Sequence, residues 1–430
     1  MPLRLYQKSE EFEAGFEGFL AARRDSEEDV DNIVADIIDN VRCDGDKALT
    51  AYTKKFDRIT LEPSELLVDA AQLDAAFARC DKETIAALEI AASRIRAFHE
   101  KQYPQTLEYE DDAGVRLGAR WNALDSVGLY VPGGTASYPS SVLMNALPAK
   151  VAGVNRIVMV VPTPDGDINP LVLAAAKLGG VNEVYRIGGA QAIAALAYGT
   201  KTICPVDKIV GPGNAYVAAA KRRVFGVVGI DLIAGPSEIL VVADAANEPD
   251  WIAIDLLSQA EHDTAAQSIL ITDSADFADK VAEAIERRLK SLPRASIASK
   301  SWEAQGAIIV VSALDDVVSL VDRIAPEHLE LAISDPGALA SKIRHAGAIF
   351  LGRYTPEAIG DYVAGPNHVL PTSRSARFSS GLGILDFMKR TTLVSCDAKS
   401  LHRIGPAAVL LAEAEGLDAH ALSVSIRLND

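Results

Sequence analysis

The sequence predicts an α/β protein: two incomplete Rossmann-like domains, each built on a parallel sheet, with an N-terminal helical region and a C-terminal helical tail. Two observations support this fold class. From about residue 127, short β-branched runs alternate with helical runs, as in parallel sheets covered by helices. Before that point, apolar residues recur at the three- and four-residue spacing of amphipathic helices. A chain of 430 residues also exceeds one ordinary core, so we expect several domains.

The expected elements divide the chain into four parts. A helical region, 1–126, carries the periodic apolar spacing in 28–57 and 69–103. Two α/β domains, 127–237 and 238–380, meet near Gly235-Pro236-Ser237. Strands are expected at 127–131, 156–161, 183–187, 208–210 and 229–233 in the first domain, and at 239–242, 269–272, 307–311, 329–333 and 348–351 in the second.

The last part of the chain changes character twice. Residues 360–383 are irregular and rich in Gly, Pro and Ser, and loops of that length inside compact proteins are usually functional. The tail, 381–430, is expected to contain a helix at 399–413 and a short end that docks on a neighbouring subunit.

Composition excludes some function classes. The net charge of −17 argues against a nucleic-acid partner, because phosphate neutralisation needs clustered Lys and Arg. The one dense basic cluster, Lys221-Arg222-Arg223, falls in an expected helix and is interpreted as a solvated face. A hydrophobic content of 49% with 23% charged residues is typical of a soluble globular protein.

The chain also lacks membrane and export signals. No apolar run approaches the ~18 residues that span a bilayer. Lys8, Glu10 and Glu11 interrupt the region where a signal peptide needs an apolar core. We therefore expect a cytoplasmic protein with no membrane partner, in which the cysteines are reduced and mostly buried. The four cysteines are widely scattered, at Cys43, Cys80, Cys204 and Cys396.

Three glycine-bearing turns follow expected strands of the first α/β domain, at 132–134, 188–191 and 211–214. Glycine lets the backbone approach a ligand closely, and a helix N-terminus offers N–H groups to phosphate. The turns should lie at one edge of the sheet, which is the usual ligand crevice of an open α/β fold. None completes the dinucleotide pattern G-x-G-x-x-G, since the nearest has Tyr216 in place of the last glycine, and there is no Walker GK[ST]. The ligand class stays open on this pattern alone.

The stretch 259–263 combines an amide with an imidazole. Residues 249–262 read as one helix, on which Gln259 and His262, three residues apart, point the same way. An amide oxygen and an imidazole nitrogen make half of a mixed oxygen/nitrogen metal site. A Gln/His pair on a helix is more often a solvated polar face, so both interpretations stand on these residues alone.

Seven stretches together resemble the histidinol dehydrogenase family, in the family's order from about Leu5 to Ile426. They are GLYVPGGTASYPSS (128–141), IGGAQA (187–192), VGPGNAYV (210–217), IAGPSE (233–238), QAEHD (259–263), APEHL (325–329) and GPNHVLP (365–371).

This resemblance implies oxidation of L-histidinol to L-histidine through the aldehyde, in the last steps of histidine biosynthesis, with NAD used twice. It also implies a homodimer with one zinc ion per subunit. By similarity, the zinc ligands are Gln259, His262, Asp361 and His420. Such a set of nitrogen and oxygen donors suits zinc and would also tolerate manganese or cobalt.

By the same resemblance, Glu327 and His328 form the acid/base pair. His328 would take the alcohol proton, and Glu327 would activate the water that attacks the aldehyde. From these residues alone, an exposed polar pair at a strand start is the alternative. The resemblance implies substrate contacts at Ser237, His368 and Glu415, in addition to the zinc ligands and His328.

The NAD contacts implied by the resemblance are Tyr130, Gln191 and Asn214, each on or beside a glycine turn. Residues 127–237 would then be the NAD-binding domain and 238–380 the metal and catalytic domain, with 1–126 packed on the latter. In the family the tail crosses to the other subunit, so Glu415 and His420 would complete the partner's site. No role is implied for His99, His345 or His402.

Three rival functions remain from the residues alone. A zinc hydrolase would use the Glu-His pair on water and would need no NAD. A covalent mechanism would need a cysteine near the site, and Cys204 is the nearest to a glycine turn. A non-catalytic binding protein would need neither Glu327 nor His328 for ligand affinity.

Overall fold

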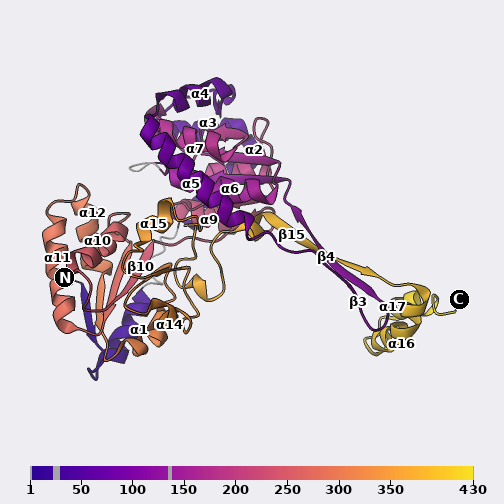
Figure 1. Ribbon diagram of the computed structural model, residues 1–430. Coiled ribbons are helices and arrows are strands. Elements are labelled where there is room, and N and C mark those ends of the chain that lie inside the picture. The colour runs from indigo at the N-terminus through magenta and orange to yellow at the C-terminus, as the bar shows by residue number, and fades with distance from the viewer. Residues whose placement is uncertain (1, 23–29, 134–137, 430) are drawn as a thin grey trace.

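A computed structural model of the protein describes residues 2–22, 30–133 and 138–429. It contains two α/β domains and a long arm that projects away from both (Figure 1). The first domain holds a six-stranded sheet in the order β2-β7-β6-β5-β8-β9, parallel except for β2. Its strands are β2 (Leu67–Val68), β5 (Ser126–Tyr130), β6 (Arg156–Val160), β7 (Glu183–Tyr185), β8 (Lys208–Val210) and β9 (Gly229–Ile230).

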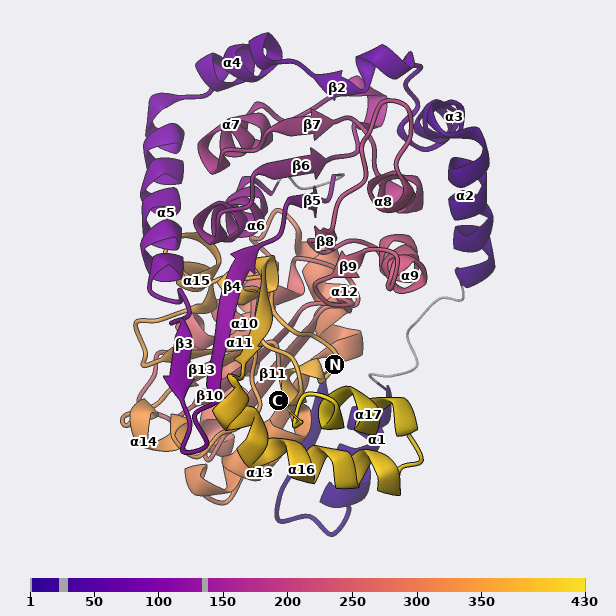
Figure 2. The same ribbon diagram turned by 90° about the vertical axis from the view of Figure 1, so that its right-hand side faces the viewer.

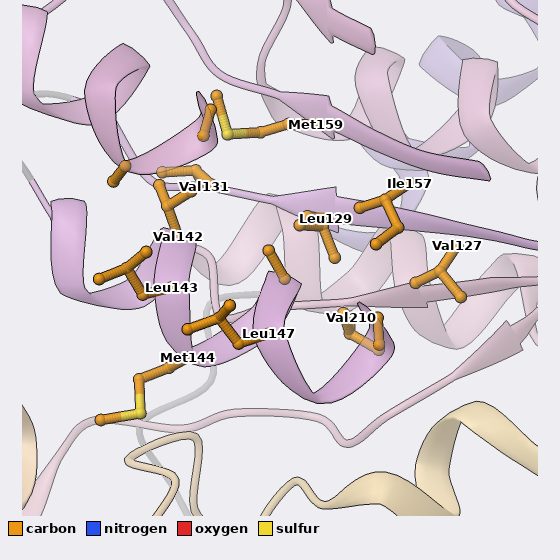
Figure 3. Close-up of a cluster of buried hydrophobic side chains, with 14 of the residues drawn as sticks. Val127, Leu129, Val131, Val142, Leu143, Met144, Leu147, Ile157, Met159 and Val210 are labelled. Atoms are coloured by element: carbon orange, nitrogen blue, oxygen red, sulfur yellow. The ribbon is translucent and has the colours of Figure 1, made fainter. Parts of the chain in front are cut away.

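Helices cover both faces of this first sheet (Figure 2). Residues alternate along β5, so that Val127 and Leu129 face one helical layer while Tyr130 faces the other. Figure 3 shows the first layer, where Leu143 and Leu147 of a neighbouring helix lie beside the strands. One layer is α4 (Ala70–Arg79), α5 (Lys82–Glu100), α6 (Pro139–Ala152) and α7 (Pro170–Gly179); the other is α2 (Asp31–Asp44), α3 (Asp46–Asp57), α8 (Gly189–Tyr198) and α9 (Ala215–Val224).

The second domain holds a fully parallel six-stranded sheet in the order β1-β12-β11-β10-β13-β14. Every residue of its central strands β10 and β11 is buried, as expected for strands that read as continuous apolar runs. The strands are β1 (Leu3–Tyr6), β10 (Glu238–Ala243), β11 (Gln267–Thr272), β12 (Ala307–Val310), β13 (His328–Ala332) and β14 (Ala348–Leu351).

The helices of the second domain also form two layers. Helices α10 (Pro249–Ala260), α11 (Ala275–Leu289) and α12 (Ala295–Gln305) pack on one face of the sheet. The other face carries α1 (Phe12–Ala22), α13 (Val317–Ile324) and α14 (Pro336–Ala340). The short helix α15 (Glu357–Tyr362) follows β14. The predicted fold class of two parallel-sheet α/β domains with helical ends is confirmed.

The arm is an antiparallel three-stranded sheet in the order β15-β4-β3, capped by two helices at the end farthest from the domains (Figure 1). Several large apolar side chains of the helical cap are exposed, including Leu410 at 67% and Leu411 at 65%. The elements are β3 (Leu107–Glu110), β4 (Arg116–Ala123), β15 (Met388–Ser395), α16 (Ala398–Ala414) and α17 (Asp418–Ser425).

The N-terminal region differs from the purely helical one expected. Leu3–Tyr6 is strand β1, which pairs with β12 at the edge of the second sheet, and α1 packs in the same domain. Helices α2 to α5 cover the first sheet instead. In β1 only Leu5 is buried, so no alternating pattern marks it as a strand.

Three local expectations are also wrong. Helix α10 ends at Ala260, so His262 lies in the turn that follows it. The thiols are not mostly buried, because Cys43, Cys204 and Cys396 are exposed and Cys80 is intermediate. Lys221 is not on a solvated face, since its side chain is 2% exposed. None of the helices in the described parts of the chain is both long and apolar enough to cross a membrane.

Candidate active site

A cleft of about 370 Å³ lies between the two α/β domains. The first domain contributes Pro132, Gly213 and Asn214, which follow β5 and β8 at the carboxyl end of its sheet. The second domain contributes Glu327 and His328 from the amino end of β13. The cleft therefore joins the usual ligand edge of one parallel sheet to the opposite edge of the other.

The backbone of Glu238, the first residue of β10, holds both members of the Glu-His pair. Its N–H donates to the Glu327 carboxylate at 2.9 Å, and its carbonyl oxygen lies 3.0 Å from Nδ1 of His328. A carbonyl only accepts, so Nδ1 carries the hydrogen and donates it. Nε2 of His328 is buried and has no hydrogen-bond partner among the described residues. The unprotonated nitrogen of this imidazole therefore has no competing donor, and it lies 3.8 Å from Oδ1 of Asp361, which lines the cleft.

Burial shifts the protonation of both residues in the direction that suits bases near neutral pH. It raises the pKa of Glu327 well above the usual range of a glutamate, and the carboxylates of Glu238 and Asp361 raise it further. Burial lowers the pKa of His328, against the opposing pull of the Asp361 carboxylate. A neutral imidazole and a carboxylate with a raised affinity for protons are the forms expected of groups that take protons from a substrate.

Glu357 is a buried acid of the cleft that no sequence motif singled out. Its Oε1 lies 3.2 Å from Nδ1 of His328, so it provides a second acceptor beside the Glu238 carbonyl. Burial raises the pKa of Glu357 well above its usual range, and the neighbouring carboxylates of Asp361 and Glu330 add to the effect. Glu357 opens α15, and the turn from β14 into that helix brings it back to His328. Glu357 approaches His328 only because the chain turns there, so the spacing of residues along the sequence could not have identified it.

Three of the four residues implied as zinc ligands line the cleft: Gln259, His262 and Asp361. Both polar atoms of the Gln259 side chain are buried and lack hydrogen-bond partners among the described residues. A buried unsatisfied amide is costly, so a ligand to its oxygen would remove a real penalty. His262 and Asp361 add an imidazole nitrogen and a carboxylate, and these donors fit zinc.

Asp361 also belongs to a second group of close donors. Single ligand atoms of His328, Glu357 and Asp361 all lie within 4.8 Å of one another. His328 is a poor ligand in that group, because its Nδ1–H is already donated to Glu238 and its Nε2 is the only nitrogen left to act as a base. We therefore favour Gln259, His262 and Asp361 as the metal donors of this chain.

Two further residues implied as substrate contacts, Ser237 and His368, lie in the same cleft. His368 is held from both sides of its ring. Nε2 lies 3.1 Å from the Ser141 hydroxyl, and Nδ1 lies 3.1 Å from the Asp361 carbonyl oxygen. Burial lowers the pKa of His368, so its ring is neutral and positioned by neighbours on α6 and α15.

The residues implied for NAD occupy different depths. Asn214 is exposed in the cleft and caps α9 by accepting the Val217 N–H at 3.2 Å. Tyr130 and Gln191 are buried behind the glycine turns. The Tyr130 hydroxyl accepts the Gly189 N–H at 3.0 Å, which ties β5 to the start of α8. The turn at 132–134 ends at Gly134, and residues 134–137 lie outside the described residues.

Glu415 and His420 are not brought to the cleft of their own chain. Glu415 follows α16 and His420 lies in α17, at the far end of the arm (Figure 1). Both are exposed. The histidines without an assigned role have local partners: Nδ1 of His99 and of His402 each lie 2.7 Å from a backbone carbonyl four residues earlier, and the His345 N–H donates to Asp322.

Fold and cleft together define an α/β enzyme whose two sheets share one site. A family model described as histidinol dehydrogenase matches residues 20–428. A histidinol dehydrogenase from Rhodospirillum rubrum is 66% identical over 430 residues, covering 100% of this chain and 99% of its own length. The same enzyme of Ruegeria pomeroyi is 62% identical over 429 residues, covering 100% and 99%. The crystal structure of histidinol dehydrogenase from Elizabethkingia anophelis superposes with a TM-score of 0.95 at 38% identity, covering 100% of this chain and 98% of that one.

These similarities identify the class and then the family. The chain is an oxidoreductase. It belongs to the histidinol dehydrogenase family.

Proposed function

We propose that the protein oxidises L-histidinol to L-histidine through the aldehyde, in histidine biosynthesis, using NAD twice and one zinc ion per subunit. The observation that carries this proposal is the fixed tautomer of His328, whose Nδ1–H is donated to Glu238 while Nε2 has no hydrogen-bond partner among the described residues. His328 lines the same cleft as Gln259, His262 and Asp361, the nitrogen and oxygen donors suited to zinc.

His328 is the base of both oxidations. An alcohol releases a hydride only as its O–H proton leaves, so Nε2 takes that proton while the hydride leaves the adjoining carbon. The Glu238 carbonyl and the Glu357 carboxyl lie 3.0 and 3.2 Å from Nδ1, and both stabilise the imidazolium that forms. The proton then passes to solvent, and the neutral ring is restored for the second oxidation.

Glu327 acts between the two oxidations. Its carboxylate takes a proton from water as the water oxygen adds to the aldehyde carbon, which gives the monoanion of the hydrate, and Glu327 then releases that proton to solvent. The second hydride leaves the same carbon while His328 takes the remaining hydroxyl proton, and the carboxylate of histidine results. The raised pKa of Glu327 makes it a stronger base than an exposed glutamate, so it suits this proton abstraction.

Gln259, His262 and Asp361 would hold the zinc ion, together with His420 of the partner subunit. Bound there, zinc would act as a Lewis acid and would fix the imidazole and amine of the substrate. Ser237 and His368 line the same cleft and would contact the substrate beside it, with Glu415 of the partner subunit.

The first α/β domain, 127–237, would bind NAD, which accepts the hydride. The support is that the turns after β5, β7 and β8 lie at one sheet edge, and that α8 and α9 begin there, so that their N-termini would favour a diphosphate. Asn214 would contact NAD directly, while Tyr130 and Gln191 would shape the turns from behind.

The active form would be a homodimer. The arm holds its helical cap away from both domains, with Leu410, Leu411 and Leu422 exposed. Exposed apolar clusters on a projecting element are typical of interfaces, and a two-fold dimer would exchange the two arms. We place the enzyme in the cytoplasm, where exposed free thiols such as Cys43 and Cys396 stay reduced.

The test is the absorbance of NADH with L-histidinol and NAD. We expect about two molecules of NADH per histidinol consumed, since four electrons leave as two hydrides. Chelator treatment should abolish the signal while circular dichroism shows an intact fold, and added zinc should restore it. Absence of NADH from the zinc-loaded dimer would refute the proposed function.

A further inference from the structure

Lys221 is buried at the far end of α9 from the cleft, although lysine is rarely buried without a partner. Its side chain is 2% exposed, and its ammonium group donates to the carboxylate of Asp231, which is also 2% exposed. The ammonium donates a second hydrogen bond, at 3.0 Å, to the carbonyl oxygen of Gly211. The ammonium group of a residue near the end of α9 therefore contacts the glycine turn that precedes this helix.

Asp231 completes the arrangement from β9. One of its oxygens contacts Lys221, while the other accepts the N–H of Gly211 at 2.7 Å. The N–H and the C=O of Gly211 are therefore both held by one buried ion pair. Side chains from two elements fix the backbone at a single residue, just where β8 ends.

Position 211 requires glycine, and the backbone of glycine is flexible, so outside contacts are needed to hold it in one conformation. Its φ is +109°, and a Cβ atom built there would lie 2.2 Å from the Tyr130 carbonyl oxygen. The residues after it, Pro212, Gly213 and Asn214, line the cleft. A shift of the Gly211 backbone would move this whole turn, which carries Asn214, the residue proposed to contact the dinucleotide directly.

Stability alone is a weak reason for such a pair. Removing two charges from water costs several kcal/mol per ion, and well-packed apolar replacements of buried ion pairs are often neutral or stabilising. We propose that Lys221 and Asp231 are positioning residues for the dinucleotide: they clamp both sides of the Gly211 backbone and hold the 211–214 turn in its NAD-binding shape. This inference rests on the proposed use of NAD.

The test compares the double variant Lys221→Met/Asp231→Leu with the unaltered protein. Met keeps the length of Lys221 and Leu keeps the branching of Asp231, and the double replacement removes the clamp without leaving one buried charge unpaired. We expect the KM and Kd for NAD to rise about tenfold or more, with kcat within about twofold, as when binding alone is weakened. The KM for histidinol and the zinc content should change little.

The matched control is Arg156→Met. Arg156 pairs with Glu183 at 2.6 Å, at the amino end of the same sheet and away from the glycine turns. It should leave the NAD affinity unchanged. An equal loss of NAD affinity in this control would overturn the clamp, because any ion pair of the sheet would then have the same effect.

The outcomes separate the inference from the proposed function. If the unaltered protein binds NAD and the double variant binds it equally well, the clamp is refuted and the function stands. If the unaltered protein neither binds nor reduces NAD, both fail. Should the double variant not fold, hydrogen exchange of the unaltered protein decides: the Gly211 amide should exchange far more slowly than a free peptide amide, and exchange at the free rate would refute the clamp.

Discussion

Exchange of the arms between two subunits can be tested by mixing two inactive variants. His328 lies in the cleft, whereas His420 lies in α17 at the end of the arm of the same chain. In a two-fold dimer with exchanged arms, each cleft uses the tail of the other subunit. A dimer of one His328→Ala chain and one His420→Ala chain then has one cleft with both defects and one cleft with neither.

The size of the recovery follows from this geometry. Random exchange of equal amounts gives about half mixed dimers, so about a quarter of all clefts become intact and activity should reach about a quarter of the unaltered level. The assay is NADH formation after joint refolding, and mixed dimers isolated with two different tags should reach about half. The control pairs His328→Ala with Gln259→Ala, both in the cleft, and should recover nothing. No gain in the first mixture would mean that each tail serves its own chain.

Two further predictions separate the roles assigned within the cleft. The His262→Ala variant should lose bound zinc together with turnover, whereas His328→Ala should keep zinc and histidinol binding but lose about 10²- to 10⁴-fold in kcat, the usual contribution of a general base. Metal analysis and steady-state kinetics check both variants. Full zinc occupancy in His262→Ala, or near-normal turnover of His328→Ala, would contradict the assignment. The Cys204→Ser variant should keep kcat within about twofold. Cys204 is exposed, and Arg156 donates to its carbonyl oxygen at the amino end of the first sheet, whereas the cleft lies at the carboxyl end. A loss of several orders of magnitude in a folded, zinc-loaded variant would favour covalent catalysis.

The two sheets were predictable because their central strands are buried on both faces. Strands such as β10 and β11 read as continuous apolar runs, and helices alternate with them along the chain. The ends of the strands were predicted less well: β9 is only Gly229–Ile230, where a five-residue strand was expected.

The arm gave no such signal. All four residues of β3 are exposed, and in β15 only Met388 is buried. A strand without a core in its own chain shows no alternation of apolar and polar residues, so its sequence looks like loop or tail. If the arm packs on a second subunit, the missing pattern is the expected result.

Single buried charges were the hardest to predict. Lys221 stands in a run of three basic residues that resembles a solvated face, and its partner Asp231 lies ten positions later, after β9. Glu357 lies in none of the family-like stretches and reaches His328 only through the turn into α15. In both cases the burial depends on a contact between two elements, and the spacing of residues within one element does not predict such a contact.

The position of the proposed acid/base pair, Glu327 and His328, follows from where the ladder between β10 and β13 begins. The first paired residues are Ile239 and His328, so Glu238 lies one residue before the ladder. Its N–H and C=O still need partners when buried, and the Glu327 carboxylate and the His328 Nδ1–H supply them. Each side chain of this pair therefore completes the hydrogen bonding of the sheet and is oriented by it, which fixes the tautomer of His328. The proposed base, held in this way, needs no flexible loop, and this would allow a catalytic site at the amino end of a parallel sheet, opposite to the edge that the open α/β fold normally uses.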